Sequence, residues 1–249
     1  IINCKKNEQL RIIGMSQLLI NTLTYNLLLA AIIAFPSGLI QGYAGFGGAL
    51  VAIPFFAILY GPVEGFAIVL FIVLFGQGAL FLDASKKANW KEVAPVSAAS
   101  AIALSLGILF LVSADPAIIR KGMAVFILFI TGFMMSGWNY SGKRSIFSAI
   151  FTGTVSGGIT GCFGVPGFPL QVMYFHTSPE KTEIKRANVL AAMACGALVA
   201  ILGLIAQDVY TETMLVQALI IAPIFIIGAK LGKYLYKISP AKWFKKVTY

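Results

Sequence analysis

Charged residues are scarce in this sequence: they make up 11% of its 249 residues, whereas a soluble domain carries roughly 25%. It has one histidine and nine acidic residues, and the acidic residues fall mostly between apolar segments. The sequence therefore lacks the nucleophile–histidine, paired-carboxylate and metal-binding sets from which enzyme sites are built. We expect a protein that is not an enzyme and that holds no cofactor and no metal.

Cysteines and nucleotide-binding patterns are equally sparse. Cys4, Cys162 and Cys195 have neither the spacing of a zinc site nor that of a disulfide framework. Gly45 and Gly47 lack the strand–helix context and the lysine of a nucleotide-binding loop. The net charge of +10 does not indicate nucleic acid, because the basic residues gather in short stretches between apolar runs, as membrane topology signals do.

Apolar residues are abundant instead. The sequence is 59% hydrophobic and its mean hydropathy is +0.88. Several windows approach or exceed the ~18 apolar residues that indicate a membrane span. The composition predicts an all-α, polytopic membrane protein, with residues 1–249 in a single transmembrane domain. Its expected partners are the lipid bilayer and a small solute.

Glycines reveal an internal repeat. Four of them recur 119 residues later in the chain, where Gly38, Gly42, Gly45 and Gly48 correspond to Gly157, Gly161, Gly164 and Gly167. Four matches at one offset indicate a duplicated unit. We expect repeat 1 to cover residues 18–140 approximately and repeat 2 to cover residues 145–249 approximately, with the last span of the second repeat absent from this sequence.

Both glycine clusters adjoin prolines, at Pro54 in the first half and at Pro166 and Pro169 in the second. Glycine and proline disfavour helix interiors, so a helix is expected to break at each cluster. Matched breaks in the two halves of a membrane protein indicate the binding site of a transporter. The alternative is that the glycines let helices pack closely, as at the Gly38/Gly42 and Gly153/Gly157 spacings.

The apolar runs predict helices at about 18–42, 49–60, 64–83, 92–112, 117–139, 146–161, 167–176, 186–206 and 213–237. Two topologies fit them. If each glycine cluster joins two half-helices in a re-entrant hairpin, the basic loops 84–91, 141–145 and 178–185 share one side and the halves are inverted repeats. If each segment crosses fully, the basic loop 178–185 falls on the outer side, which the positive-inside rule disfavours.

The segments GYAGFGGALVAIP (42–54) and GCFGVPGFP (161–169), together with the repeat and its short basic loops, resemble the sulfite exporter TauE/SafE family of bacterial anion permeases. The resemblance covers residues 25–249. It implies a secondary transporter of the cell inner membrane that moves small organosulfur anions, such as sulfite, sulfonates or sulfoacetate, by alternating access. An anion channel of the same architecture, a carrier of non-sulfur organic anions and a homodimer stay open as alternatives. Val165 and Pro166 stand where the family commonly has glycine, which leaves the shape of the pocket open.

We expect the anion to contact residues in and beside the two breaks. The candidates are Gln41, Gly42, Tyr43, Gly45, Phe46, Gly47, Gly48, Gln77, Gly161, Phe163, Gly164, Pro166, Gly167, Gln171, Arg186 and Asn188. Helix N-termini attract anions, so the glycine N–H groups are the expected donors.

Each polar candidate has a structural alternative. The glutamines and Asn188 could form interhelical hydrogen bonds, and Arg186 could anchor a helix end at the membrane surface. His176 could relay protons or cap a helix, because histidine titrates near neutral pH.

Overall fold

The computed structural model describes residues 25–45, 47–135 and 145–238, and every regular element in these ranges is an α-helix. In chain order the helices are α2 (Tyr25–Ala44), α3 (Gly48–Tyr60), α4 (Pro62–Lys87), α5 (Trp90–Ser113), α6 (Pro116–Met135), α7 (Ile146–Phe163), α8 (Phe168–His176), α9 (Thr182–Ala206) and α10 (Glu212–Ile238). The predicted all-α fold is confirmed, and the helix bounds agree within four residues wherever they fall in the described ranges. The expected helix ends near 18 and 139 and the expected missing span lie outside those ranges.

Local sequence signals explain several of the helix ends. Asn89 caps α5 by accepting a hydrogen bond from the Lys91 N–H, and Ser145 forms a capping box at the start of α7. Gly61, with φ 94°, turns the chain sharply after α3, and Pro62 then opens α4. These polar and glycine positions separate apolar helices, so they set where each helix can begin.

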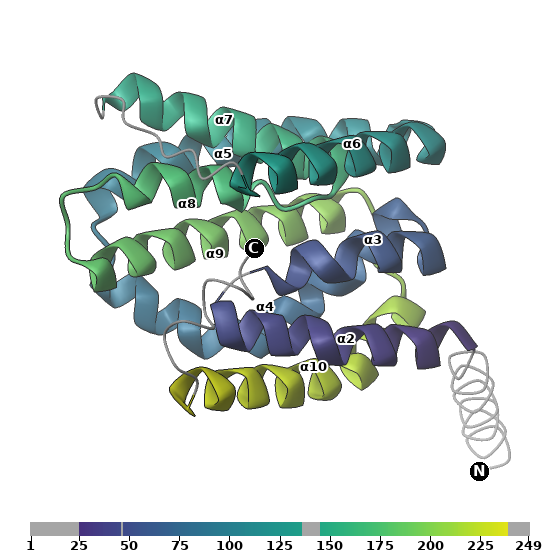
Figure 1. Cartoon of the computed structure of the whole chain (residues 1–249). Helices are drawn as coiled ribbons and strands as arrows, with labels where there is room; N and C mark the ends of the chain where they lie inside the picture. The colour runs from purple at the N-terminus through teal and green to yellow at the C-terminus, as the bar shows by residue number, and fades with distance from the viewer. Residues whose placement is uncertain (1–24, 46, 136–144, 239–249) are drawn as a thin grey trace, which may run out of the picture.

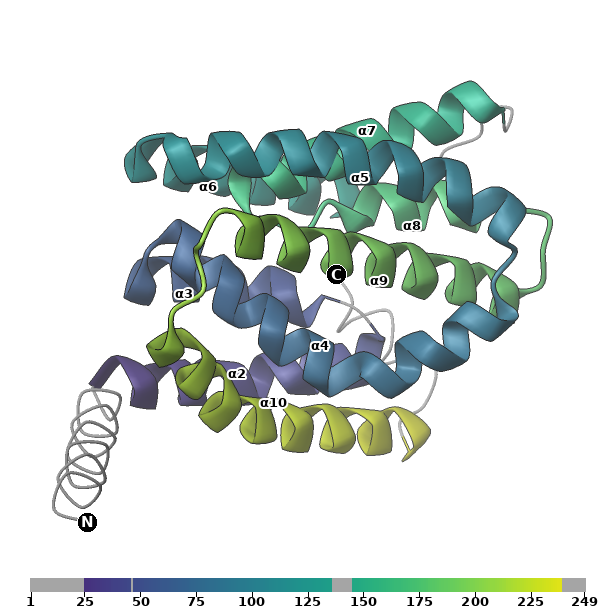
Figure 2. The same ribbon diagram turned by 180° about the vertical axis from the view of Figure 1, so that it is seen from behind.

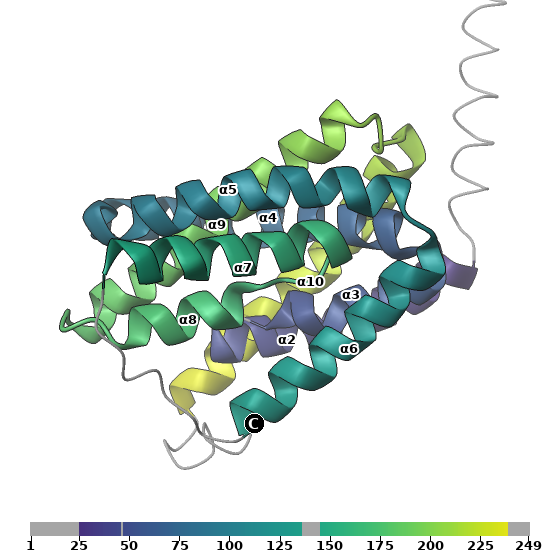
Figure 3. The ribbon, with the colours of Figure 1, turned by 90° about the horizontal axis from the view of Figure 1, so that it is seen from above.

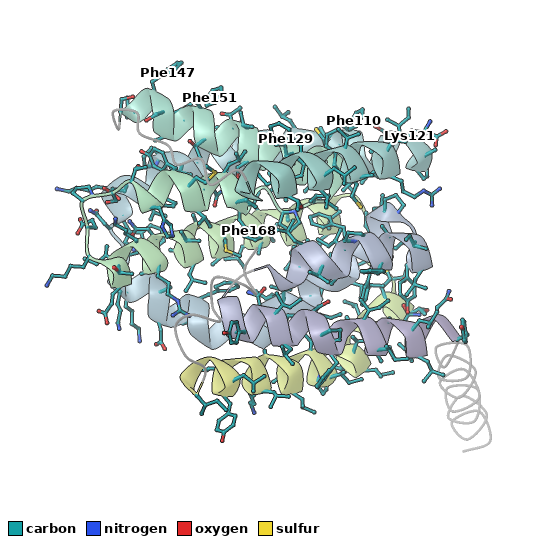
Figure 4. All side chains as sticks on the ribbon, in the orientation of Figure 1. Phe110, Lys121, Phe129, Phe147, Phe151 and Phe168 are labelled. Carbon is teal, nitrogen blue, oxygen red and sulfur yellow. The ribbon has the colours of Figure 1, made fainter. Side chains whose placement is uncertain are left out.

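The fold is that of a multi-pass membrane protein. Among the helices of the described residues, five (α2, α5, α7, α9 and α10) are long and apolar enough to cross a bilayer, and α4, which bends by 68° between its two arms, would be a sixth. Large apolar side chains are exposed on the outside, among them Phe147, Phe151 and Phe129, which point away from the bundle (Figure 4). Such a surface is stable against lipid and would be a liability in water.

Helices from the two halves of the chain pack against one another. α2 from the first half packs along α10 from the second, and α5 from the first half packs along α7 from the second. α4 and α9 lie between these two pairs, where they contact each other (Figures 1 and 2). α6 lies at the outer edge, where it contacts α7 and α3 (Figure 3).

Close approach of these helices depends on glycine. A Cβ atom on Gly38 or Gly42 would collide with the backbone of α10 at Phe225 or Ala229. A Cβ atom on Gly157 would likewise collide with α5 at Ser100. The close-packing interpretation is therefore confirmed for Gly38, Gly42, Gly153 and Gly157, while Gly45, Gly47 and Gly164 lie in the breaks that follow.

Candidate functional site

The first break separates α2 from α3. Gly45 and Gly47 have φ values of 84° and 97°, a left-handed conformation that favours glycine. Gln41 bridges the break: its Oε1 accepts a hydrogen bond from the Gly48 N–H at 2.7 Å, and its Nε2 donates to the Gly45 carbonyl at 3.3 Å. Both ends of the Gln41 amide are thus used to hold the loop in shape.

The second break, between α7 and α8, is also held by a residue of the preceding helix. Gly164 has a φ of 65°, and its N–H donates to the Thr160 carbonyl at 2.9 Å. The Gly167 N–H donates to Thr160 Oγ1 at 2.8 Å. Thr160 lies 119 residues after Gln41, so the same position of the sequence repeat supplies the side chain that accepts a hydrogen bond across each break. Sequence analysis missed Thr160, although the repeat offset points to it once the role of Gln41 is known.

These bonds change the expected chemistry of the breaks. The N–H groups of Gly45, Gly48, Gly164 and Gly167 already donate to groups within α2 and α7. These four of the expected glycine N–H donors are therefore already engaged in this conformation. Their hydrogen bonds hold the breaks in shape.

A cation does reach the first break. The guanidinium of Arg186, from the start of α9, lies against Gly45: a Cβ atom on that glycine would be 3.2 Å from Arg186 Nη2. Arg186 is exposed, and Gly45 and Gly47 are half-buried. Among the described residues no carboxylate forms an ion pair with Arg186. The structure thus brings together two predicted residues from opposite halves.

The equivalent place at the second break is apolar. The ring of Phe66, from α4, packs against Gly164, where a Cβ atom would lie 3.2 Å from Phe66 Cβ. Phe66 and Val165 are both fully buried. The two breaks therefore share a left-handed glycine at the same repeat position, Gly45 and Gly164. They differ in what faces it, a cation at the first break and an aromatic ring at the second.

The chain matches the model of the sulfite exporter TauE/SafE family over residues 29–249, which includes both breaks and all the helices around them. It belongs to the sulfite exporter TauE/SafE family. Comparisons with curated proteins and with solved structures give no match. Membership confirms the resemblance carried by residues 42–54 and 161–169, and it makes the chain a membrane transporter of the sulfite or anion type.

Other candidates lie in different surroundings within this TauE/SafE fold. Phe163 packs against α6 at Gly122 and edge-on to Phe110, with ring centroids 6.4 Å apart. Tyr43 is buried, and Pro166 is half-buried beside Val165. Gly42 lies in the contact with α10 described above, and a Cβ atom on Gly161 would collide with the backbone of α5 at Leu104. Phe46 and the side chain of Gln77, in the bend of α4, lie outside the described part of the molecule.

Asn188 is fully buried in a polar network that joins α9 to the α4–α5 turn. Its Oδ1 accepts from the Asn89 N–H at 2.8 Å, and its Nδ2 donates to Glu92 Oε2 at 3.1 Å. Ser178 also donates to Glu92, at 3.1 Å, and Asn89 donates to Glu180 at 2.9 Å. Both ends of the Asn188 amide are therefore engaged in hydrogen bonds to other elements, which is the structural alternative given for this residue in the sequence analysis. Sequence analysis did not single out the acidic and serine members of this network.

His176 lies at the end of α8, where its carbonyl accepts a hydrogen bond from Lys185 Nζ at 2.8 Å. Partial desolvation of the ring, together with the nearby positive charge of Lys185, lowers the pKa of His176 below its usual 6.5 and favours the uncharged ring. Among the described residues, no group of three or more His, Cys, Asp or Glu side chains could hold a metal ion.

Replacing Thr160 with valine should lower stability by about 1 kcal/mol, the usual loss when a helix-capping side chain is removed, because the Gly167 N–H loses its acceptor. Thermal unfolding in detergent measures the effect. Thr152→Val is the matched control, since both threonine hydroxyls bond the carbonyl four residues earlier but only Thr160 also accepts from the break. Equal unfolding temperatures for the two variants would contradict a capping role.

Proposed function

We propose that this protein is a secondary transporter that moves small organosulfur anions, of the sulfite, sulfonate or sulfoacetate type, across the bacterial inner membrane by alternating access. The observation that carries the proposal is the contact between the Arg186 guanidinium and Gly45. It places a permanent positive charge from one repeat against the helix break of the other.

Arginine suits such an anion for chemical reasons. Its planar guanidinium can donate two parallel hydrogen bonds to the oxygens of one oxyanion. Gly45 has no side chain, so the guanidinium can lie directly against the backbone of the break. A sulfonate or sulfite presents several acceptor oxygens on one small head, which fits a site built from donors.

The arrangement of the halves supports a transporter of inverted repeats. α2 and α4 run in one direction across the molecule, and their counterparts α7 and α9 run in the opposite direction (Figure 2). α3 and α8 each double back beside the preceding helix, as the short arm of a re-entrant hairpin does (Figures 1 and 2). Inverted repeats with broken helices are a common plan for secondary transporters.

Charge supports an orientation in the membrane. The α4–α5 turn and the α8–α9 loop lie at the same end of the molecule, which carries Lys86, Lys87, Lys91, Lys181 and Lys185 (Figure 2). The opposite end, with the α5–α6 turn and the α9–α10 loop, carries Asp115, Asp208 and Glu212 as well as Arg120 and Lys121. By the positive-inside rule the first end faces the cytoplasm.

The difference between the breaks supports alternating access. Arg186 is exposed and Gly45 is half-buried at the first break, while Phe66 packs against the second break and is fully buried. In a transporter of inverted repeats, the two halves exchange conformations as the site opens to one side and then to the other. A more exposed first break and a buried second break are what one state of such a cycle would have.

Flux into proteoliposomes tests the proposal, with sulfite, sulfoacetate, taurine, sulfate and carboxylate analogues as solutes. We expect saturable uptake of the sulfur oxyanions and trans-stimulation by an unlabelled anion inside. Unsaturable flux without trans-stimulation would indicate the channel alternative. Transport of carboxylates alone would overturn the organosulfur assignment and leave a carrier of other organic anions.

A further inference from the structure

Gln171, in the first turn of α8, makes a hydrogen bond that is unusually short for the atoms assigned to it. Its side chain is 5% exposed and that of its partner Ser156 is 1% exposed. Gln171 Nε2 lies 2.6 Å from Ser156 Oγ, while Gln171 Oε1 has no partner among the described residues. Bonds from N–H to oxygen are roughly 2.7–3.2 Å long, whereas those from a hydroxyl to oxygen are roughly 2.5–3.0 Å long.

The short distance fits the opposite orientation of the amide. The oxygen and the NH₂ of a glutamine side chain have nearly the same shape, so the amide can turn by half a rotation without altering its packing. Once it is turned, the Ser156 hydroxyl donates to the glutamine oxygen at a distance that suits this bond. The buried group without a partner is then the NH₂, which is a donor only.

We propose that the NH₂ of Gln171 is the donor by which the second half holds the transported anion, and that Gln41 is only a structural brace of the first break. Both ends of the Gln41 amide are bonded within the break, so it has little to offer a ligand. Gln171 has one end anchored by Ser156 and the other end unsatisfied in a buried place. A buried donor without a partner costs free energy, and a bound acceptor would remove that cost.

The position of Gln171 fits this role, which rests on the proposed anion transport. α8 and α9 are the two arms of one hairpin and pack against each other. Gln171 lies five residues before the end of α8, and Arg186 lies four residues after the start of α9. At 1.5 Å per residue, both residues lie about 6–8 Å along their helices from the helix ends that the α8–α9 loop joins. Two groups that only donate favour a fully ionised oxyanion over a protonated acid.

The test compares Gln171→Met with Gln41→Met in detergent, with and without anions. We expect Gln171→Met to unfold close to the wild-type temperature, because the Ser156 hydroxyl loses its acceptor while the unsatisfied NH₂ is removed, and to lose about tenfold or more of the affinity with which sulfite or sulfoacetate stabilises the protein. Gln41→Met should unfold at a lower temperature without anion, because the Gly48 N–H loses its acceptor. Gln171→Glu keeps an acceptor for Ser156 but adds a negative charge, so it should abolish the stabilisation.

Two results would overturn the role of Gln171. One is a Gln171→Met variant that is destabilised as strongly as Gln41→Met, and the other is one that keeps wild-type affinity for the anions. If no anion of the transport panel stabilises the wild-type protein or is transported by it, the transport proposal fails. The unfolding temperatures of the two variants without anion still show whether Gln171 stabilises the fold.

Discussion

Arg186→Gln should reduce the transport of sulfur oxyanions by about 10- to 100-fold, the range expected when a hydrogen bond to a charged group is lost. The guanidinium lies against Gly45, so its loss removes the positive charge from the first break. Arg186→Lys should retain part of the activity, because it keeps the charge but loses the planar pair of donors. The measurement is initial uptake into proteoliposomes at several anion concentrations, and the loss should appear mainly as a higher KM.

The matched control is Lys181→Gln, which removes an exposed positive charge at the N-terminal cap of the same helix. It lowers the basic charge of the loop by the same amount and leaves the first break unchanged. If Arg186 merely anchors the helix at the membrane surface, the two variants should show the same uptake. Equal kinetics would therefore refute the anion-binding role.

The second large effect is expected from a pair of neighbouring glycines in α7. Gly157→Ala should destabilise the protein by about 3 kcal/mol, at the upper end of overpacking penalties, because the new methyl group collides with the backbone of α5 at Ser100. Gly158→Ala meets nothing within 4 Å and should be neutral or stabilise the helix by up to about 1 kcal/mol.

Fluorescence-detected size-exclusion chromatography after heating measures both variants in crude detergent extracts. The two substitutions add the same methyl group at adjacent positions, so they affect helix propensity equally and differ only in packing. The folded yield of Gly157→Ala should fall well below that of Gly158→Ala. Similar yields would mean that α5 and α7 do not pack through Gly157.

The sequence predicts the breaks well because their cause is local. Left-handed glycines end a helix from within the local chain, so the ends of α2 and α7 could be located without knowing what surrounds them. Proline alone is a weaker signal, because Pro36 and Pro54 lie inside α2 and α3. The membrane class is predictable for a similar reason, since it depends on composition and on the length of apolar runs. Both are properties of the chain that tertiary contacts do not alter.

The partners of the polar side chains could not be predicted, because tertiary packing decides them. Arg186 and Asn188 are two residues apart on α9, yet one faces Gly45 and the other is enclosed by Asn89 and Glu92. Gln41 and Gln171 both adjoin a break, yet only one of them uses both ends of its amide. Each outcome depends on which helix of the other half lies opposite, and spacing along one helix does not reveal that.

The packing of helices from one half against those of the other has a consequence for how the protein is made. The glycine face of α2 fits the backbone of α10, which emerges from the ribosome only after nearly all the other helices have been inserted. During synthesis α2 is therefore inserted into the lipid before α10, the helix against which it packs in the folded protein. A single half, expressed by itself, would leave that face uncovered, and it could complete the bundle only by associating with another half.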